Sequence, residues 1–425
     1  MKKKKAPLGR RMKEFVKTSV VWGPLDHNLF FTIIFLNVYG IIMVYSASYN
    51  NSITKNYSYF MNNQLKNVIF GFVIMIVASY VNYHRIVRLG WDWFWLLAAV
   101  AIIAALKTPL AHSELGATRW IKLGPVSFQA AEPIKAAIII FFAYYVSYWG
   151  LNRWYNQLLA CLLAIALLGF LFFFSNNLST VIVLFCICAV IILSSVKKPD
   201  LYWYFLLGLA LIIIAAIFVT VYLLMHQGAE NFRFVRIRAW LHPEEYAADE
   251  GLQAMQARYA IGAGGFWGKG LGQSLIKFKL SYSYNDFILA IICEELGVFG
   301  VIVMMTLFGY LLYRIYKIAQ NAWDIEGKVL AIGVFTQIAL QLLINVMVVT
   351  SVIPTTGVTL PFFSAGGTSV VFLLAELGMV LNVDKYAKER RFFEEAERHV
   401  AQMEQRGGIG AAGWRRRLDS ARTRR

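Results

Sequence analysis

The sequence predicts an all-α protein that spans a membrane about ten times. Of its 425 residues, 59% are hydrophobic and 15% are charged, a balance that suits a chain surrounded by lipid better than one surrounded by water. The apolar residues form runs long enough to cross the hydrocarbon core of a bilayer as helices, which takes about 20 residues each. The predicted spans are residues 29–47, 68–81, 91–106, 133–148, 158–174, 178–193, 202–224, 287–312, 329–350 and 362–383.

The charge pattern predicts how these spans are oriented. The formal net charge is +17, and the basic residues lie mainly at the two ends and in short connections between apolar runs. Anionic lipid headgroups explain this charge better than nucleic acid does, so no nucleic-acid partner is predicted. Because Lys and Arg gather on the cytoplasmic side of membrane proteins, both termini are predicted to be cytoplasmic.

The same pattern divides the chain into three parts. We predict a basic cytoplasmic N-terminus (1–27), a transmembrane domain (28–384) and a charged cytoplasmic tail (385–425). A large extracellular loop (226–285) is expected between the seventh and eighth helices. This loop carries several cations against the charge bias, which indicates that they serve a ligand and not the topology.

Metal and disulfide chemistry find little support in the residue pattern. All four cysteines lie within or beside apolar spans, where packing is the usual role of a free cysteine. The histidines are scattered and lack the spacing typical of a metal site. No metal-ligating residues are therefore predicted.

Three spans that run inward from the external side begin with polar residues. Glu132 opens the fourth span, Asn176 and Asn177 precede the sixth, and Asn285 and Asp286 precede the eighth. One interpretation is N-capping, because Asn and Asp side chains satisfy free backbone N–H groups. The other is a shared ligand site, because three helix N-termini at one depth present partial positive charge to a phosphate. Position alone leaves both interpretations open.

Polar residues are unusually dense just before and within the fourth span. Arg119, Trp120 and Gln129 precede Glu132 closely, and Lys135 lies one helical turn deeper than Glu132. The i, i+3 spacing allows Glu132 and Lys135 to form an ion pair. Such a pair is either structural or functional, and charges inside a membrane are usually functional.

Two further tracts lack the pattern of a membrane helix. Residues 260–272 are richer in glycine than a helix tolerates, which indicates a backbone that approaches something closely, with a flexible linker as the alternative. Residues 354–368 resemble a re-entrant segment, which is tolerated at membrane depth only where it lines a cavity. Taken alone, the second tract is equally typical of a transporter.

Together these motifs resemble those of the SEDS family of polytopic cell-wall polymerases, which includes FtsW, RodA and SpoVE. The matching tracts are residues 116–121, 128–135, 256–272, 286–297 and 354–369. Their order and spacing carry the resemblance, since each tract alone is weak. Residues 292–295 and 366–370 are more similar to FtsW-type division proteins than to RodA-type elongation proteins.

The resemblance implies a peptidoglycan glycosyltransferase that polymerises lipid II at the outer face of the cytoplasmic membrane. Its role would be septal wall synthesis in cell division or the maintenance of cell shape. Asp286 falls on the family's essential aspartate and would act as the general base that deprotonates the acceptor sugar. An inverting displacement needs only this one base, unlike the two carboxylates of glycoside hydrolases.

The leaving group implied is a polyprenyl pyrophosphate, which needs positive charge as its bond breaks. Arg119, Lys135 and Arg236 stand where the family pattern has a basic residue, whereas Arg258 and Lys269 are candidates on charge and location. The predicted substrate-binding residues are Arg119, Trp120, Gln129, Glu132, Lys135, Arg236, Gln256, Arg258, Lys269, Thr356 and Ser364.

The chain departs from the family pattern at three places. Ala130 and Ala131 replace a Pro-Ser pair, Asn177 replaces a common aspartate, and Ser283-Tyr284 replace a Pro-Glu pair. No cofactor is implied with certainty, and a divalent cation, Mg²⁺ or Mn²⁺, is left open. The implied partners are a class B penicillin-binding protein, which is a transpeptidase, and other division or elongation proteins.

Two other functions compete with the polymerase. A lipid II flippase needs a polar route that reaches both membrane faces, whereas the unusual polar residues here gather on the external side. A non-catalytic divisome scaffold predicts that replacing Asp286 leaves function intact.

Overall fold

The computed structural model describes most of the chain. The described residues are 21, 23–48, 59–89, 93–109, 111–114, 117–123, 126–175, 177–196, 232–242, 245, 250–278, 285–364, 367–405 and 414–415. The predicted seventh span (202–224), the first 20 residues and most of the basic C-terminal end lie outside them.

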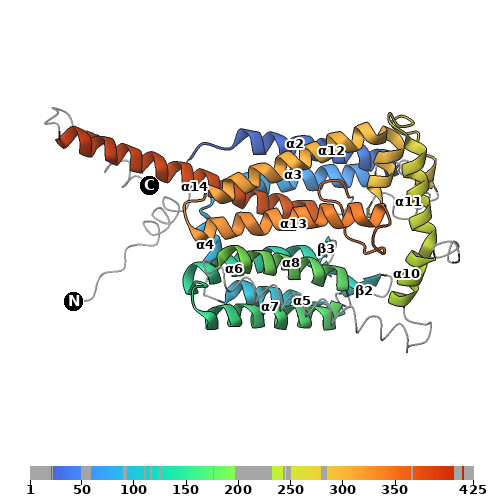
Figure 1. The fold of residues 1–425 in the computed structure, drawn as a ribbon, viewed down its shortest axis with the longest axis horizontal. Helices are drawn as coiled ribbons and strands as arrows, with labels where there is room; N and C mark the ends of the chain where they lie inside the picture. Colours follow the sequence, from blue (N-terminus) through green and yellow to red (C-terminus); the bar gives the residue numbers. More distant parts are fainter. Residues whose placement is uncertain are drawn as a thin grey trace.

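The predicted helical class is confirmed, since long helices dominate the structure. The helices are α2 (His27–Ser48), α3 (Tyr59–Tyr80), α4 (Tyr83–Val87), α5 (Phe94–Ala105), α6 (Ala131–Trp149), α7 (Trp154–Ser175), α8 (Leu178–Ser195), α10 (Phe232–Leu241), α11 (Glu250–Gly264), α12 (Ile288–Gln320), α13 (Ile325–Val349) and α14 (Thr368–Gln405), with a 3₁₀ turn at Ile276–Phe278. Most run roughly parallel as a bundle, and α10 and α11 cross one end of it (Figure 1).

Six described helices are long and apolar enough to cross a membrane: α2, α3, α7, α8, α12 and α13. Every predicted span except the seventh overlaps a described helix. Three predicted spans overlap helices outside this group of six. These helices are α5, which is short, and α6 and α14, which carry buried charges. The chain is therefore an integral membrane protein, and the total of ten spans stays a prediction.

Helix ends differ from the predicted bounds where polar residues continue a helix. Helix α3 starts at Tyr59, well before the predicted residue 68, because its first turns contain polar residues such as the buried Gln64. Helix α14 continues to Gln405 instead of ending near residue 383, and its last turns extend beyond the bundle (Figure 1). Ion pairs at i, i+4, such as Lys388 with Asp384 at 2.6 Å, support this extension.

A small antiparallel sheet, absent from the all-α prediction, lies between α5 and α6. Its strands are β1 (Ala111–Glu114), β2 (Ala117–Leu123) and β3 (Val126–Gln129), in the order β1-β2-β3. The pairing of β2 with β3 sets Trp120 directly opposite Gln129. Ile121, next along β2, is buried and anchors the sheet to the bundle.

The glycine-rich tract packs against the backbone of α12. Helix α11 continues through Gly264, so the first part of the tract is helical, contrary to expectation. A Cβ atom at Gly264 would lie 1.8 Å from the Cys293 carbonyl oxygen, and one at Gly268 would lie 2.2 Å from that of Glu295. Helix α12 bends at Gly297, whose φ is 64°. The predicted close backbone approach is confirmed, and its partner is another helix of the chain.

Candidate active site

Asp286 lies on a turn that opens α12. Residues 285–287 form this turn, and the N-cap of α12 is Phe287, whose side chain makes no capping hydrogen bond. The Oδ1 atom of Asn285 has no hydrogen-bond partner among the described residues, so Asn285 does not cap α12, and for Asp286 both interpretations stay predictions. By contrast, the side chain of Asn177 accepts a hydrogen bond from Thr180 N at 3.4 Å and does cap α8.

Hydrogen bonds from the side chains of Asn345 and Ser364 to backbone carbonyls fix the Asp286 turn. Asn345 on α13 donates to the Asp286 carbonyl at 2.9 Å and to the Val358 carbonyl at 3.0 Å. Ser364 donates to the Asn285 carbonyl at 2.9 Å and accepts from Leu360 N at 2.8 Å. The Asp286 side chain itself is half-buried, so this backbone frame holds it where it still reaches solvent.

Residues 354–364 run as non-helical backbone between three helices, as the sequence predicts. Ser179 on α8 donates to the Thr356 carbonyl at 2.9 Å, and Gln64 on α3 donates to the Ser364 carbonyl at 3.5 Å. A Cβ at Gly40 on α2 would lie 2.2 Å from the Phe362 carbonyl oxygen, so that helix also packs closely. The segment is thus tied to the bundle along its length.

A small, partly open cavity of about 30 Å³ lies beside this segment. Its lining residues are Gln129, Ala131, Glu132, Lys135, Asn177, Ser179, Thr180, Val183, Gln341, Gly357, Val358 and Thr359. The structure thereby brings together Gln129, Glu132 and Lys135 from the predicted set. Asp286 is connected to the cavity through Asn345, which holds both Asp286 and the lining residue Val358.

Glu132 and Lys135 form the predicted ion pair on the cavity wall. Lys135 Nζ lies 2.8 Å from Glu132 Oε2, and the two side chains are only 3% and 5% exposed. Pairing offsets the high cost of holding either charge in a low-dielectric site. The cavity therefore has a strongly bound pair of opposite charges in its wall.

The remaining predicted binding residues lie on the sheet and on α10 and α11. Trp120 and Gln129 are cross-strand neighbours, while the side chain of Arg119 in β2 lies outside what the structure describes. Arg236 is on α10, and Gln256 is on α11, where its Oε1 atom has no hydrogen-bond partner within the described ranges.

Two of the predicted cations already bind groups of the chain. Arg258 donates to the Ser351 hydroxyl at 2.9 Å, and Trp240 on α10 donates to the Ser351 carbonyl at 2.9 Å. Lys269 Nζ lies 2.7 Å from Glu294 Oε1. These contacts give Arg258 and Lys269 structural partners, and a role for either in binding a ligand stays a prediction.

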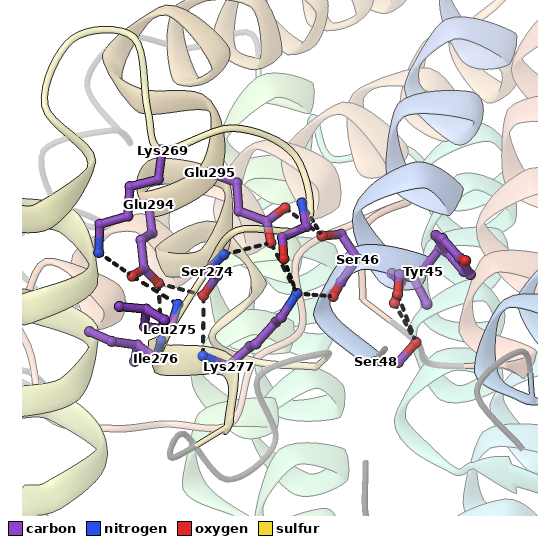
Figure 2. Close-up of polar contacts among 12 residues, drawn as sticks. Tyr45, Ser46, Ser48, Lys269, Ser274, Leu275, Ile276, Lys277, Glu294 and Glu295 are labelled. Carbon is purple, nitrogen blue, oxygen red and sulfur yellow. Dashed lines mark hydrogen bonds and ion pairs between the residues drawn. The ribbon is translucent and has the colours of Figure 1, made fainter. Parts of the chain in front are cut away.

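Figure 2 shows a second polar cluster, which we call the Glu294–Glu295 network. Its members are Ser46, Lys269, Ser274, Lys277, Glu294 and Glu295. Glu294 accepts from Lys269, from the Ser274 hydroxyl and from two backbone N–H groups. Glu295 accepts from Ser46 and Ser274 N, and Lys277 lies 3.6 Å away. The network fastens residues 269–277 to α12.

Sequence reasoning missed a polar stripe on α13. Gln337, Gln341 and Asn345 recur every four residues and so share one face. Gln337 donates to the buried Glu376 of α14 at 2.8 Å, Gln341 lines the cavity, and Asn345 holds the Asp286 turn. The signal was present as polar residues inside apolar runs, which usually have a function.

The structure also bears on metal binding. Across the described ranges, no group of three or more His, Cys, Asp or Glu side chains is arranged to hold a metal ion. A divalent cation therefore stays a prediction, and any such ion would need ligands from the substrate or from other residues.

Comparisons with known proteins give this geometry a context. The family model for FtsW, RodA and SpoVE, described as "Cell cycle protein", matches residues 26–389. A probable peptidoglycan glycosyltransferase FtsW of Trichlorobacter lovleyi is 31% identical over 382 residues, 88% of this chain and 96% of that protein. Stage V sporulation protein E of Bacillus subtilis is 33% identical over 370 residues, 84% and 96% of the two chains.

Two solved structures share the fold. One belongs to work described as "Structural coordination of polymerization and crosslinking by a peptidoglycan synthase complex", with a TM-score of 0.72, 22% identity, and coverage of 86% of this chain and 99% of the other. The other is the rod shape determining protein RodA of Thermus thermophilus, with a TM-score of 0.61, 22% identity, and coverage of 85% and 97%.

Proposed function

Because the chain belongs to the FtsW, RodA and SpoVE family, we propose that it is a peptidoglycan glycosyltransferase that polymerises lipid II into glycan strands. Relatives that match most of its length are named as probable enzymes of this kind. The observation that carries the proposal is the Asp286 turn, which Asn345 holds beside a cavity whose wall contains the Glu132–Lys135 pair. The product would serve division or cell shape.

In the proposed reaction, Asp286 acts as general base. It accepts the proton of the acceptor sugar's 4-hydroxyl while the hydroxyl oxygen attacks the anomeric carbon of the donor. The bond from that carbon to the pyrophosphate breaks, and its electron pair stays on the phosphate oxygen. One displacement inverts the anomeric centre. The half-buried position of Asp286 supports this role, because a carboxylate with access to water remains ionised.

The departing pyrophosphate needs positive charge, and we assign that role first to Lys135. It lies in the cavity wall, which neither Lys269 nor Arg258 lines. A cation held in a dry site stabilises developing charge far better than one in water. Arg119 and Arg236 remain further candidates from the family pattern.

The other predicted binding residues divide by how fully they are hydrogen-bonded. Ser364 already makes two hydrogen bonds, so its proposed role is to shape the 354–364 segment. Thr356 Oγ1 and Gln256 Oε1 have no partner among the described residues, which supports direct contact with hydroxyl groups of the sugar. Gln129 and Trp120, paired across the sheet, would form the adjoining wall.

We place the cavity end of the bundle at the outer face of the cytoplasmic membrane and both termini in the cytoplasm. The positive-inside charge pattern supports this orientation. The domain bounds proposed are those predicted: 1–27, 28–384 with the loop 226–285, and 385–425. We also propose a cross-linking partner of the class B penicillin-binding type, since a similar fold occurs in a complex described as coordinating polymerisation and crosslinking.

The structure favours the polymerase over the flippase. Toward the N-terminus of α13 from Gln337, the same face carries Gly333, which packs on Ile139, and the buried Leu330. Among the described residues the polar stripe on this face of α13 is therefore interrupted between Gln337 and the buried Glu326. A protein that carries lipid II across the bilayer would need a continuous polar route past these apolar residues.

The test is reconstitution of the purified protein in liposomes with lipid II, with and without the cross-linking partner. The wild type should form glycan strands, and Asp286→Asn should reduce product by about 10²–10⁴-fold. Asp324→Asn, at the start of α13 and far from the cavity, is the matched control and should retain product formation. Movement of lipid II across the bilayer without polymer would support the flippase instead.

A further inference from the structure

The most unusual charge in the bundle is Glu376 on α14. Its side chain is 1% exposed, and Gln337, which is fully buried, donates to its Oε2 atom at 2.8 Å. The other oxygen of each side chain, Glu376 Oε1 and Gln337 Oε1, has no hydrogen-bond partner within the described ranges. Two acceptor atoms are thus left unsatisfied side by side on one buried pair of residues, which native interiors rarely tolerate.

The charges around Glu376 do not balance if every group is ionised. The charged groups that act on Glu376 within the described chain are Lys135 and Glu132, both on α6. Lys135 is already bound to Glu132 at 2.8 Å. Two carboxylates and one ammonium leave one negative charge, which is costly to hold uncompensated inside a membrane.

We propose that Glu376 holds a proton and forms a cyclic acid–amide pair with Gln337. The Glu376 hydroxyl would donate to Gln337 Oε1 while the Gln337 amide donates to Glu376 Oε2. One proton then satisfies both unpartnered oxygens and cancels the excess charge. The site is a buried proton-binding site, distinct from the Asp286 turn.

The consequence for the cavity rests on the proposed function. With Glu376 neutral, Lys135 has Glu132 as its one ionised partner and stays at the cavity wall. Loss of the proton would create a second anion that competes for Lys135 and draws it away from the diphosphate. Glu376 is therefore a positioning residue for Lys135. Gln341, one helical turn from Gln337, lines the cavity and offers a short path for proton exchange.

Infrared difference spectroscopy of the full-length protein tests the proton directly, without any substrate. The wild type should show the C=O stretch of a protonated carboxylic acid at neutral pH, and Glu376→Gln should lose that band. Glu294→Gln, which alters a buried carboxylate of the Glu294–Glu295 network, should keep it. Gln337→Leu should shift the band, because the amide partner is removed. An unchanged spectrum in Glu376→Gln, or only the loss of a carboxylate band, would overturn the proposal.

Polymerisation as a function of pH tests the positioning role. The wild type should lose activity about tenfold per pH unit once Glu376 ionises, whereas Glu376→Gln should lack this alkaline fall. A Glu376→Gln protein that folds normally but has the wild-type alkaline profile would contradict the role. If neither protein makes polymer, the proposed function fails while the infrared result still decides the protonation of Glu376.

Discussion

Two buried polar clusters in this protein contain similar residues but differ in how they are satisfied. In the Glu294–Glu295 network, serines, lysines and backbone N–H groups surround two carboxylates (Figure 2). In the cavity cluster (Glu132, Lys135, Gln337, Gln341, Asn345 and Glu376), oxygens of Gln337, Asn345 and Glu376 have no partner among the described residues.

This difference separates a structural cluster from a functional one. Buried polar groups are nearly always hydrogen-bonded, so a fully satisfied network has little left to offer a ligand. The cavity cluster leaves acceptors open on Gln337 and Asn345, each one helical turn from the lining residue Gln341, and on Glu376, where substrate or a proton can complete them. Both clusters contain charges inside the bundle, so charge alone would not have distinguished them.

The largest expected effect is at Lys135 in the cavity cluster. Lys135→Met leaves Glu132 buried without its partner, so stability should fall by about 3–5 kcal/mol. Polymerisation per folded molecule should fall about 10²–10³-fold, because the leaving group loses its counter-charge. Thermal unfolding in detergent and gel analysis of glycan product measure the two effects.

A paired variant separates stability from chemistry at this site. Glu132→Gln with Lys135→Met removes both charges, so stability should largely recover while activity stays low. Wild-type activity in the double variant would mean that the pair does not take part in the reaction.

The Glu294–Glu295 network should respond in the opposite way. Glu294→Ala leaves Lys269 and Ser274 without their acceptor and should destabilise the protein by about 3–5 kcal/mol. Activity per folded molecule should change little, since this network does not line the cavity. A large loss of activity with a normal unfolding temperature would show that the Glu294–Glu295 network takes part in the reaction, and would contradict its purely structural role.

Two glycines of α11 give a matched steric comparison. Gly264→Ala would place a methyl group against the Cys293 carbonyl and should cost about 1–3 kcal/mol. Gly262→Ala meets nothing within 4 Å and should stabilise the helix by about 0.5–1 kcal/mol. Equal effects from the two substitutions would show that α11 does not pack on α12 as described.

The smallest effect concerns a third cluster, at the N-terminus of α13. Burial opposes ionisation of Asp324, but hydrogen bonds from His84, Gly327 N and Tyr83 outweigh it and hold the pKa of Asp324 below the ordinary 3.8. Its contribution to stability is therefore present above pH 3.8 and lost as pH falls through the lower, folded value.

Asp324→Asn should cost about 1 kcal/mol at neutral pH and reduce this acid dependence. Unfolding curves at several pH values measure it, with the exposed Glu395→Gln as control. If the stability of Asp324→Asn falls with acid as steeply as that of the wild type, other carboxylates cause the acid dependence.

Much of the fold follows from the apolar runs, because about 20 apolar residues have few alternatives to a membrane helix. The exceptions arise where local pattern and tertiary contact disagree. The short strands around Trp120 carry too weak a pattern to predict, and the helical glycines near Gly264 are tolerated because their partner, Cys293, comes close from another helix. The local sequence around Gly264 does not predict that Cys293 will contact it.

The candidate site was predictable in part for similar reasons. The spacing of Glu132 and Lys135 predicts their ion pair, and family resemblance assigns Asp286 its role. Glu376 and Gln337 were missed because the apolar residues around each of them dominate the average hydropathy of the run. Their pairing depends on the packing of α13 against α14, which local sequence does not specify.

The most direct test measures Asp286→Asn and Glu294→Gln side by side, for lipid II polymerisation and for unfolding temperature. We predict that Asp286→Asn keeps the wild-type unfolding temperature and makes about 10²–10⁴-fold less glycan. Glu294→Gln should unfold at lower temperature yet polymerise normally per folded molecule. Glycan from Asp286→Asn at the wild-type rate would contradict the assignment of Asp286 as the base.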